Sequence, residues 1–211
     1  MDFVNFKESN AFMSGHVACP GCVEALSMRV ILNKVGPNAV AVVPPSCTAV
    51  ICGPHPNSAI GIPVYHTSLE SSGASASGVR RALNAQGKND TTVLVMAGDG
   101  GTYDIGFQAL SSAVERNEDI LYICFDNEGY MNTGGQKSAS TPLHAATGST
   151  PAGKVSKKKN IIEMLAAQEI PYVATASPGH LEDMANKVEK AMAIKGMRFI
   201  AVNIPCLPGW G

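Results

Sequence analysis

Short apolar runs alternate with segments of helical periodicity along most of this chain. Five runs rich in β-branched residues predict strands, at 39–43, 92–97, 120–125, 172–175 and 199–204. Apolar residues at helical spacing predict helices around them, at 22–35, 105–116, 160–168 and 181–194. Nearly continuous apolar strands are covered on both faces, as in parallel sheets. The alternation therefore predicts an α/β fold with a doubly wound, mainly parallel sheet.

Composition excludes several classes of protein. The formal net charge of -1 lacks the basic excess that nucleic-acid binding needs. No apolar run reaches the roughly 18 residues that cross a bilayer, and residues 1–10 lack the apolar core of a signal peptide. We therefore expect a cytoplasmic protein with no membrane partner, in which the six cysteines serve as ligands or buried packing rather than as disulfides.

Chemically useful residues follow two of the predicted strands. Gly98, Asp99, Gly100 and Gly101 follow the strand at 92–97, and Asn127 follows the strand at 120–125. The carboxyl ends of parallel strands meet at one edge of a sheet, where α/β proteins bind ligands. Asp99 and Asn127 offer the hard oxygen atoms that Mg²⁺ prefers, and glycines let backbone N–H groups approach a diphosphate. A lone Gly-Asp-Gly is also typical of an ordinary turn, but the asparagine at this spacing favours the diphosphate interpretation.

The cysteines form a second pattern. Cys19 and Cys22 form a C-x-x-C motif, while Cys47 and Cys206 each follow a predicted strand. Together, four thiolates suit either zinc or an iron–sulfur cluster. Their uneven spacing lacks the second C-x-x-C of a zinc ribbon, which favours the cluster. Cys124 lies inside an apolar run and is expected to be a small buried hydrophobe.

Longer motifs connect the chain to a known family. Residues 98–106 read Gly-Asp-Gly-Gly-Thr-Tyr-Asp-Ile-Gly, and residues 130–136 read Tyr-Met-Asn-Thr-Gly-Gly-Gln. Through these motifs the chain resembles, over residues 15–206, the β subunit of pyruvate:ferredoxin oxidoreductase and of other 2-oxoacid:ferredoxin oxidoreductases. In that family, the Gly-Asp-Gly motif with its downstream asparagine is the signature of thiamine diphosphate binding.

The resemblance implies a single thiamine diphosphate-binding domain over residues 1–211, with the N-terminal cysteine motif contributing to an iron–sulfur site. Mg²⁺ would be held by Asp99, the Asn127 side chain and the Gly129 carbonyl. The diphosphate would lie along Gly98, Gly100 and Gly101, while Asn132 and Thr133 would face the reactive end of the cofactor. The four cysteines would hold a [4Fe–4S] cluster beside it.

The resemblance also implies an activity. The family oxidatively decarboxylates a 2-oxoacid, by default pyruvate, to CO₂ and acetyl-CoA; coenzyme A takes the acyl group and ferredoxin takes the electrons. The glutamate that activates the cofactor comes from another subunit or domain, so this chain would be incomplete alone. Partner subunits would carry the pyrimidine half-site and further iron–sulfur clusters, in an oxidoreductase of anaerobic metabolism.

Three alternatives stay open. Oxalate oxidoreductase belongs to the same branch, so oxalate competes with pyruvate as the substrate. A thiamine diphosphate decarboxylase or synthase without a cluster is the second alternative. The third is a non-enzymatic, zinc-stabilised module that binds a phosphorylated ligand. Relatives usually continue beyond Gly211, so the chain is expected to be either a shortened member or an incomplete sequence. Relatives also often carry glycine where this chain has Val23, so we expect different packing around the substrate or the cluster.

An irregular segment, 138–159, is expected to form a long functional loop or lid. It contains a basic run of Lys154, Lys157, Lys158 and Lys159. Such a run is typical of a solvated loop, and it would also suit docking of an acidic ferredoxin.

Overall fold

The computed structural model describes residues 11–211, so the prediction that residues 1–10 carry no signal peptide lies outside the described residues. Its helices are α1 (Val23–Val35), α2 (Cys47–Cys52), α3 (Ser72–Ala85), α4 (Phe107–Glu115), α5 (Ile161–Ala166), α6 (Leu181–Met192) and α7 (Leu207–Trp210), with a π-helix, η1, over Gly100–Ile105. Its strands are β1 (Ala39–Val43), β2 (Val64–His66), β3 (Thr92–Gly98), β4 (Leu121–Asp126), β5 (Tyr172–Ala176) and β6 (Arg198–Asn203). No helix in this described part of the chain combines the length and apolar character that crossing a membrane requires.

The strands form one parallel sheet, as predicted. Their order is β2-β1-β3-β4-β6-β5, and every neighbouring pair is parallel. The four inner strands are almost entirely buried, which explains why apolar runs predict them. Cys124 in β4 is fully buried, as expected. The sequence does not predict the edge strand β2, because its three residues are all partly or fully exposed.

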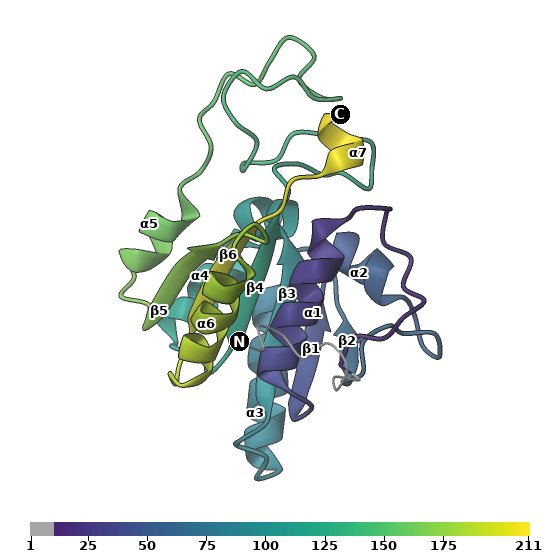
Figure 1. Ribbon diagram of the computed structural model, residues 1–211. Coiled ribbons are helices and arrows are strands. Elements are labelled where there is room, and N and C mark those ends of the chain that lie inside the picture. The colour runs from purple at the N-terminus through teal and green to yellow at the C-terminus, as the bar shows by residue number, and fades with distance from the viewer. Residues whose placement is uncertain (1–10) are drawn as a thin grey trace.

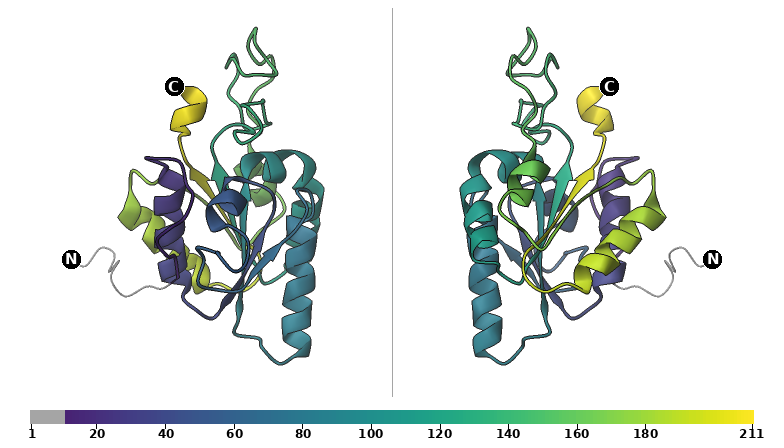
Figure 2. Two further views of the ribbon diagram at one scale, coloured as in Figure 1. Left: turned by 90° about the vertical axis from the view of Figure 1, so that its right-hand side faces the viewer. Right: turned by 90° about the vertical axis from the view of Figure 1, so that its left-hand side faces the viewer.

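Helices cover both faces of this sheet (Figure 2). α1 packs beside α6 on one face, and α3 packs beside α4 on the other. Successive residues of β3 point to opposite faces, so Leu94 and Met96 join one core cluster while Val93 and Val95 join the other. Two cores on either side of one sheet confirm the doubly wound arrangement.

A long irregular segment lies over the carboxyl edge of the sheet (Figure 1). Residues 127–160, between β4 and α5, rise above this edge beside α7 and contain no helix or strand, in agreement with the irregular segment expected at 138–159. The helix predicted at 105–116 is α-helical only from Phe107, because the preceding turns form η1. Such π-helical turns occur often at functional sites.

Candidate active site

Two pockets open at the carboxyl edge of the sheet, and they share a wall. The cofactor pocket is lined by all eight residues predicted to bind or face the cofactor: Gly98, Asp99, Gly100, Gly101, Asn127, Gly129, Asn132 and Thr133. The cysteine pocket is lined by the four predicted cluster ligands, Cys19, Cys22, Cys47 and Cys206. Cys47, Asn127 and Asn132 line both pockets. The structure therefore brings the two predicted groups together on opposite sides of these three residues.

Asp99 lies deep in the cofactor pocket, directly after β3. Only 1% of its surface is exposed. Ser138, from the loop above, donates a hydrogen bond to Asp99 Oδ2. Burial, and then the nearby charge of Asp126, raise the pKa of Asp99 to about 8. A carboxylate that is this difficult to ionise by itself is stabilised in its charged form when a cation binds.

Three oxygen atoms converge beside Asp99. Asn127 Oδ1 lies 3.0 Å from Asp99 Oδ1 and 2.7 Å from the Gly129 carbonyl oxygen, so three acceptors face one another. Turning the amide over would make two hydrogen bonds, whereas a divalent cation would bind all three oxygens as they stand. The other end of the amide, Nδ2, faces Cys47 Sγ at 3.7 Å, and a thiolate there accepts from it. The residues present fit both a magnesium ion and a ligating thiolate.

A second buried carboxylate, Asp126, ends β4. Tyr103 and Ser140 donate hydrogen bonds to it, at 3.1 and 2.5 Å. Lys158 forms an ion pair with it at 2.8 Å. Burial acts to lower the pKa of Lys158, but the charges of Asp126 and Glu128 outweigh this effect and leave it raised. The loop is therefore tied to the end of β4 by the ion pair of Lys158 and by the buried hydrogen bond of Ser140.

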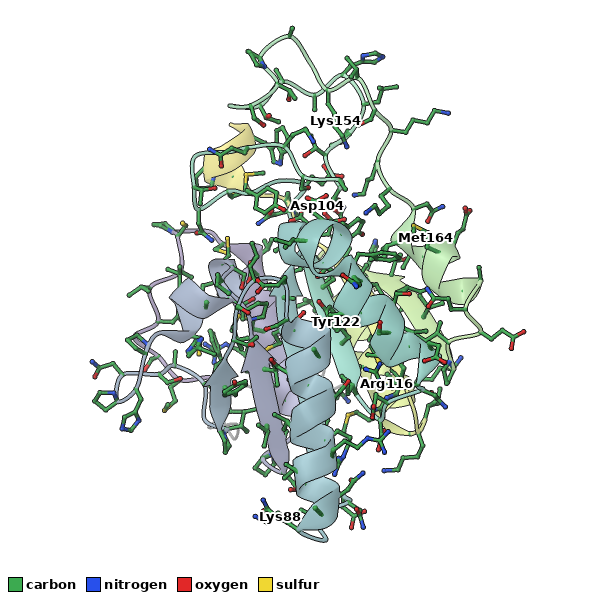
Figure 3. The ribbon with its side chains drawn as sticks, turned by 180° about the vertical axis from the view of Figure 1, so that it is seen from behind. Lys88, Asp104, Arg116, Tyr122, Lys154 and Met164 are labelled. Atoms are coloured by element: carbon green, nitrogen blue, oxygen red, sulfur yellow. The ribbon has the colours of Figure 1, made fainter. Side chains whose placement is uncertain are left out.

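Gly100 lets an aromatic ring approach the backbone of η1. A Cβ at this position would lie 2.2 Å from the ring of Tyr130, so the approach requires glycine. The Tyr130 hydroxyl lies 3.1 Å from the Gly100 carbonyl oxygen and 2.9 Å from Asp104 Oδ2. Figure 3 shows Asp104 at the carboxyl edge, beneath the loop that carries Lys154. Asp104 also accepts the backbone N–H of Ala139, which joins η1 to that loop.

The four cysteines come from three separate segments of the chain. Cys19 lies in an exposed turn, Cys22 precedes α1, Cys47 begins α2 and Cys206 precedes α7. Burial raises the pKa of Cys47 to about 12, with smaller contributions from Glu24 and then from the neighbouring thiols. Within residues 11–211, no three His, Cys, Asp or Glu side chains meet closely enough to hold a single metal ion. The thiols line a pocket without converging on one point.

Comparison with known proteins places this site in a family. A family model described as "Thiamine pyrophosphate enzyme, C-terminal TPP binding domain" matches residues 47–202. Pyruvate synthase subunit PorB of Methanothermobacter thermautotrophicus is 48% identical over 209 residues, which cover 97% of this chain and 73% of the relative. The chain belongs to the β subunits of the 2-oxoacid:ferredoxin oxidoreductases. It is therefore a subunit of a thiamine diphosphate-dependent oxidoreductase, and the enzyme has partner subunits.

Other members of this family differ in substrate. Ketoisovalerate oxidoreductase subunit VorB of Pyrococcus abyssi is 46% identical, over 94% of this chain and 67% of the relative. The solved 2-oxoglutarate:ferredoxin oxidoreductase from Magnetococcus marinus has the same fold, with a TM-score of 0.82 at 22% identity over 95% of this chain and 68% of that one. The second likeness confirms the fold class. Because two relatives of similar identity are named for different 2-oxoacids, identity alone does not select the substrate.

Glu24 is a residue of this β subunit that the sequence analysis does not single out. It is 2% exposed, lines the cysteine pocket and accepts a hydrogen bond from Thr48 at 2.6 Å. Burial raises the pKa of Glu24 to about 7. Helical spacing could have predicted that Glu24 is buried, because it lies four and seven residues before the buried Met28 and Ile31, on the same face of α1.

The expectation of a solvated basic run is wrong for Lys154, which is buried, whereas Lys157 and Lys158 are exposed. Lys154 is 2% exposed and donates to two backbone carbonyl oxygens of the loop itself. Lys158 forms the ion pair with Asp126, and Lys159 donates to the Tyr103 carbonyl oxygen. Lys157 is exposed and, within residues 11–211, takes part in no ion pair. The loop buries carbonyl and carboxylate oxygens, which need hydrogen-bond donors once they leave water, and lysines of the loop are those donors.

Proposed function

We propose that this β subunit, together with its partner subunits, converts pyruvate and coenzyme A into acetyl-CoA and CO₂, with the electrons passed to ferredoxin. The C1–C2 bond of pyruvate breaks, a thioester C–S bond forms, and one proton and two electrons are released to two one-electron acceptors. One observation carries the proposal: Cys47, Asn127 and Asn132 line both pockets. Electrons released on the cofactor side have this wall to cross before they reach the thiols.

The cofactor pocket offers a complete set of groups for a magnesium diphosphate. Thiamine diphosphate supplies, when bound, the electron sink that lets CO₂ leave. Asp99, Asn127 and Gly129 would hold Mg²⁺ through their converging oxygens. Gly98, Gly100 and Gly101 would present backbone to the diphosphate. Asn132 and Thr133 would face its reactive end, and Thr133 is oriented by a hydrogen bond to Gln136.

The place and spacing of the cysteines favour a [4Fe–4S] cluster over zinc. Cys19, Cys22, Cys47 and Cys206 line one pocket, and this pocket shares a wall with the cofactor pocket, where a cluster would accept electrons. Their spacing in the chain lacks the second C-x-x-C of a zinc ribbon. The zinc-stabilised binding module is therefore the weaker alternative.

The lining of the cofactor pocket supports a 2-oxoacid with a single carboxylate. Within residues 11–211, no lysine, arginine or histidine lines this pocket, so this chain offers no cation to a second carboxylate. Leu69 and Met131 give it apolar surface instead, which suits the methyl group of pyruvate. Oxalate, with two carboxylates, is the alternative substrate.

We also treat residues 1–211 as one thiamine diphosphate-binding domain, and the cytoplasm as its compartment. One sheet carries both pockets, and the cysteine motif before α1 adds two of the four thiols. All six cysteines are free, which fits a reducing compartment.

Analysis of the enzyme complex, purified without oxygen, tests this proposal. We expect a brown complex that contains thiamine diphosphate and equal amounts of iron and sulfide, and that reduces a viologen dye with pyruvate and coenzyme A. Cys206→Ser should lower the iron content and leave the thiamine content unchanged. A colourless complex with zinc would overturn the proposal, and faster reduction with oxalate than with pyruvate would reassign the substrate.

A further inference from the structure

The shared wall contains a cysteine with two side-chain amides beside it. Asn132 Nδ2 lies 3.3 Å from Cys47 Sγ, and Asn127 Nδ2 lies 3.7 Å from the same atom. Both asparagines belong to the segment after β4 that lines the cofactor pocket. A sulfur at the edge of one pocket is therefore contacted by donors that line the other.

The other cysteines have different surroundings. Cys22 accepts backbone N–H groups from the first turn of α1, and Cys206 accepts one from Gly209. None of these donor residues lines the cofactor pocket. Within residues 11–211, Cys47 is the one cysteine of the four whose sulfur is contacted by side-chain amides. Cys47 is thus the cysteine that connects the residues lining the cofactor pocket with the other three cysteines.

One orientation of the Asn127 amide suits both sites at once. In it the oxygen faces Asp99 Oδ1 and the Gly129 carbonyl oxygen, and the nitrogen faces Cys47 Sγ. Without a cation the opposite orientation is favoured, because its nitrogen donates to both of those oxygens. With a thiolate and a cation the first orientation is favourable at both ends, so the two ligands select the same orientation. Asn132 is not one of the three residues whose oxygens converge beside Asp99, so substituting it leaves the predicted magnesium ligands in place.

Amide donors to a ligating thiolate act on its cluster in a known direction. Reduction adds negative charge that is shared with the thiolate sulfurs, and an N–H donor stabilises this charge. Such partners therefore raise the reduction potential of the metal centre that they contact. The two asparagine donors act on the one cysteine of the four that also lines the cofactor pocket.

We propose that the side-chain amides of Asn132 and Asn127 donate hydrogen bonds to the Cys47 thiolate and raise the reduction potential of the cluster that this thiolate ligates. The proposal rests on the proposed function, because it requires the cluster. Asn132 acts on the cluster through Cys47, so it is a positioning residue for electron transfer, in addition to its predicted place facing the cofactor. Its loss should make the cluster harder to reduce without removing it.

A redox titration of the whole complex, followed by electron paramagnetic resonance, tests this directly. Cys47→Ser identifies the signal of this cluster as the one that is lost or altered. In Asn132→Ala we expect full iron content and a more negative midpoint potential than in the wild type. Asn132→Asp should be more negative still, because it replaces the donor with a charge. Asn132→Gln, which keeps an N–H donor, should recover part of the shift.

Ser58→Ala is the matched control, because it removes a hydroxyl that lies 3.5 Å from Cys52 Sγ, a thiol outside the set of four. Its cluster potential should equal that of the wild type. Equal potentials in Asn132→Ala, Ser58→Ala and the wild type would overturn this proposal alone. If Asn132→Ala loses iron, its potential cannot be measured, and Asn132→Asp takes its place in the test. A midpoint potential of Asn132→Asp equal to that of the wild type would then overturn this proposal. A wild-type complex with no cluster at Cys47 would overturn the proposed function as well.

Discussion

The two sides of the shared wall are held in place in different ways. On the oxygen side, formed by Asp99, Asn127 and Gly129, loop hydroxyls already bond the carboxylates: Ser138 donates to Asp99, and Ser140 to Asp126. On the thiol side, formed by the four cysteines, the Cys22 backbone N–H donates to the Cys19 carbonyl oxygen, but within residues 11–211 no side-chain hydrogen bond joins two of the thiols. The loop therefore fixes a carboxylate of the first side, whereas no contact between the thiols fixes their positions relative to one another on the second side.

Strand register explains the difference. β3 pairs with β4 from Leu94 with Leu121 through to Gly98 with Phe125, so the residues just beyond both strands are placed side by side by the sheet. The cysteines instead come from a turn and from the starts of three helices, whose positions no common ladder fixes. The oxygen side is therefore expected to keep its shape without its ligand, while the thiol side is expected to depend on the cluster for its final geometry.

Asp99→Asn has the largest expected effect, and it tests whether the two sides are independent. The change keeps the size of the side chain but removes the only anionic group among the three oxygen ligands. Affinity for magnesium thiamine diphosphate should fall by more than about 100-fold, because changes to outer partners alone cost about 10–100-fold. Calorimetric titration of the complex measures this. Iron content should equal that of the wild type, and joint loss of iron and thiamine would show that the two sides form one unit.

The same contrast separates what the sequence predicts from what it does not. Asp99 and Asn127 are predictable because each follows an apolar run, and parallel strands bring such positions to one edge. Ser138 is fully buried against Asp99, but it lies in a loop whose path no periodicity describes. Glu24 is missed for a different reason. A charged residue is ordinarily expected to be exposed, and only its helical spacing from Met28 and Ile31 indicates that Glu24 lies on the buried face of α1. The partner of a lysine such as Lys158 is equally hard to predict, because Asp126 lies 32 residues earlier in the chain.

Lys158→Met should loosen the loop over the oxygen side. It leaves buried Asp126 without its ion-pair partner, but the lysine side chain is 35% exposed, so solvent reduces the cost. We expect the free energy of opening of residues 138–160 to fall by about 2 kcal/mol, which corresponds to roughly 30-fold faster hydrogen–deuterium exchange of the loop amides. Lys157→Met, at the exposed position of the same run, is the control and should change exchange little. Equal rates in both variants would mean that the ion pair does not hold the loop.

Ser138→Ala has a smaller expected effect on the same side. Its hydroxyl orients Asp99 by donating to Oδ2, which leaves Oδ1 toward Asn127. Magnesium affinity in the presence of thiamine diphosphate should fall about 10-fold, in the range found for outer-shell partners. Ser149→Ala provides the comparison, because that hydroxyl accepts the backbone N–H of Lys137 and contacts the Thr147 hydroxyl at an exposed part of the loop, away from Asp99. If both variants bind magnesium like the wild type, the oxygen side does not need its loop hydroxyls.

Cys52→Ala should have the smallest effect, and it examines the thiol side. Cys52 ends α2, the helix that Cys47 begins, and five residues at about 100° each turn the two side chains roughly 140° apart. Cys47 therefore reaches the cysteine pocket while Cys52 is fully buried in the core. Losing one buried sulfur should destabilise α2 by about 1 kcal/mol, visible as faster amide exchange of that helix. Iron content and cluster potential should not change. A fall in iron as large as in Cys206→Ser would mean that α2 can present either thiol, and that the thiol side is set by the cluster rather than by the helix.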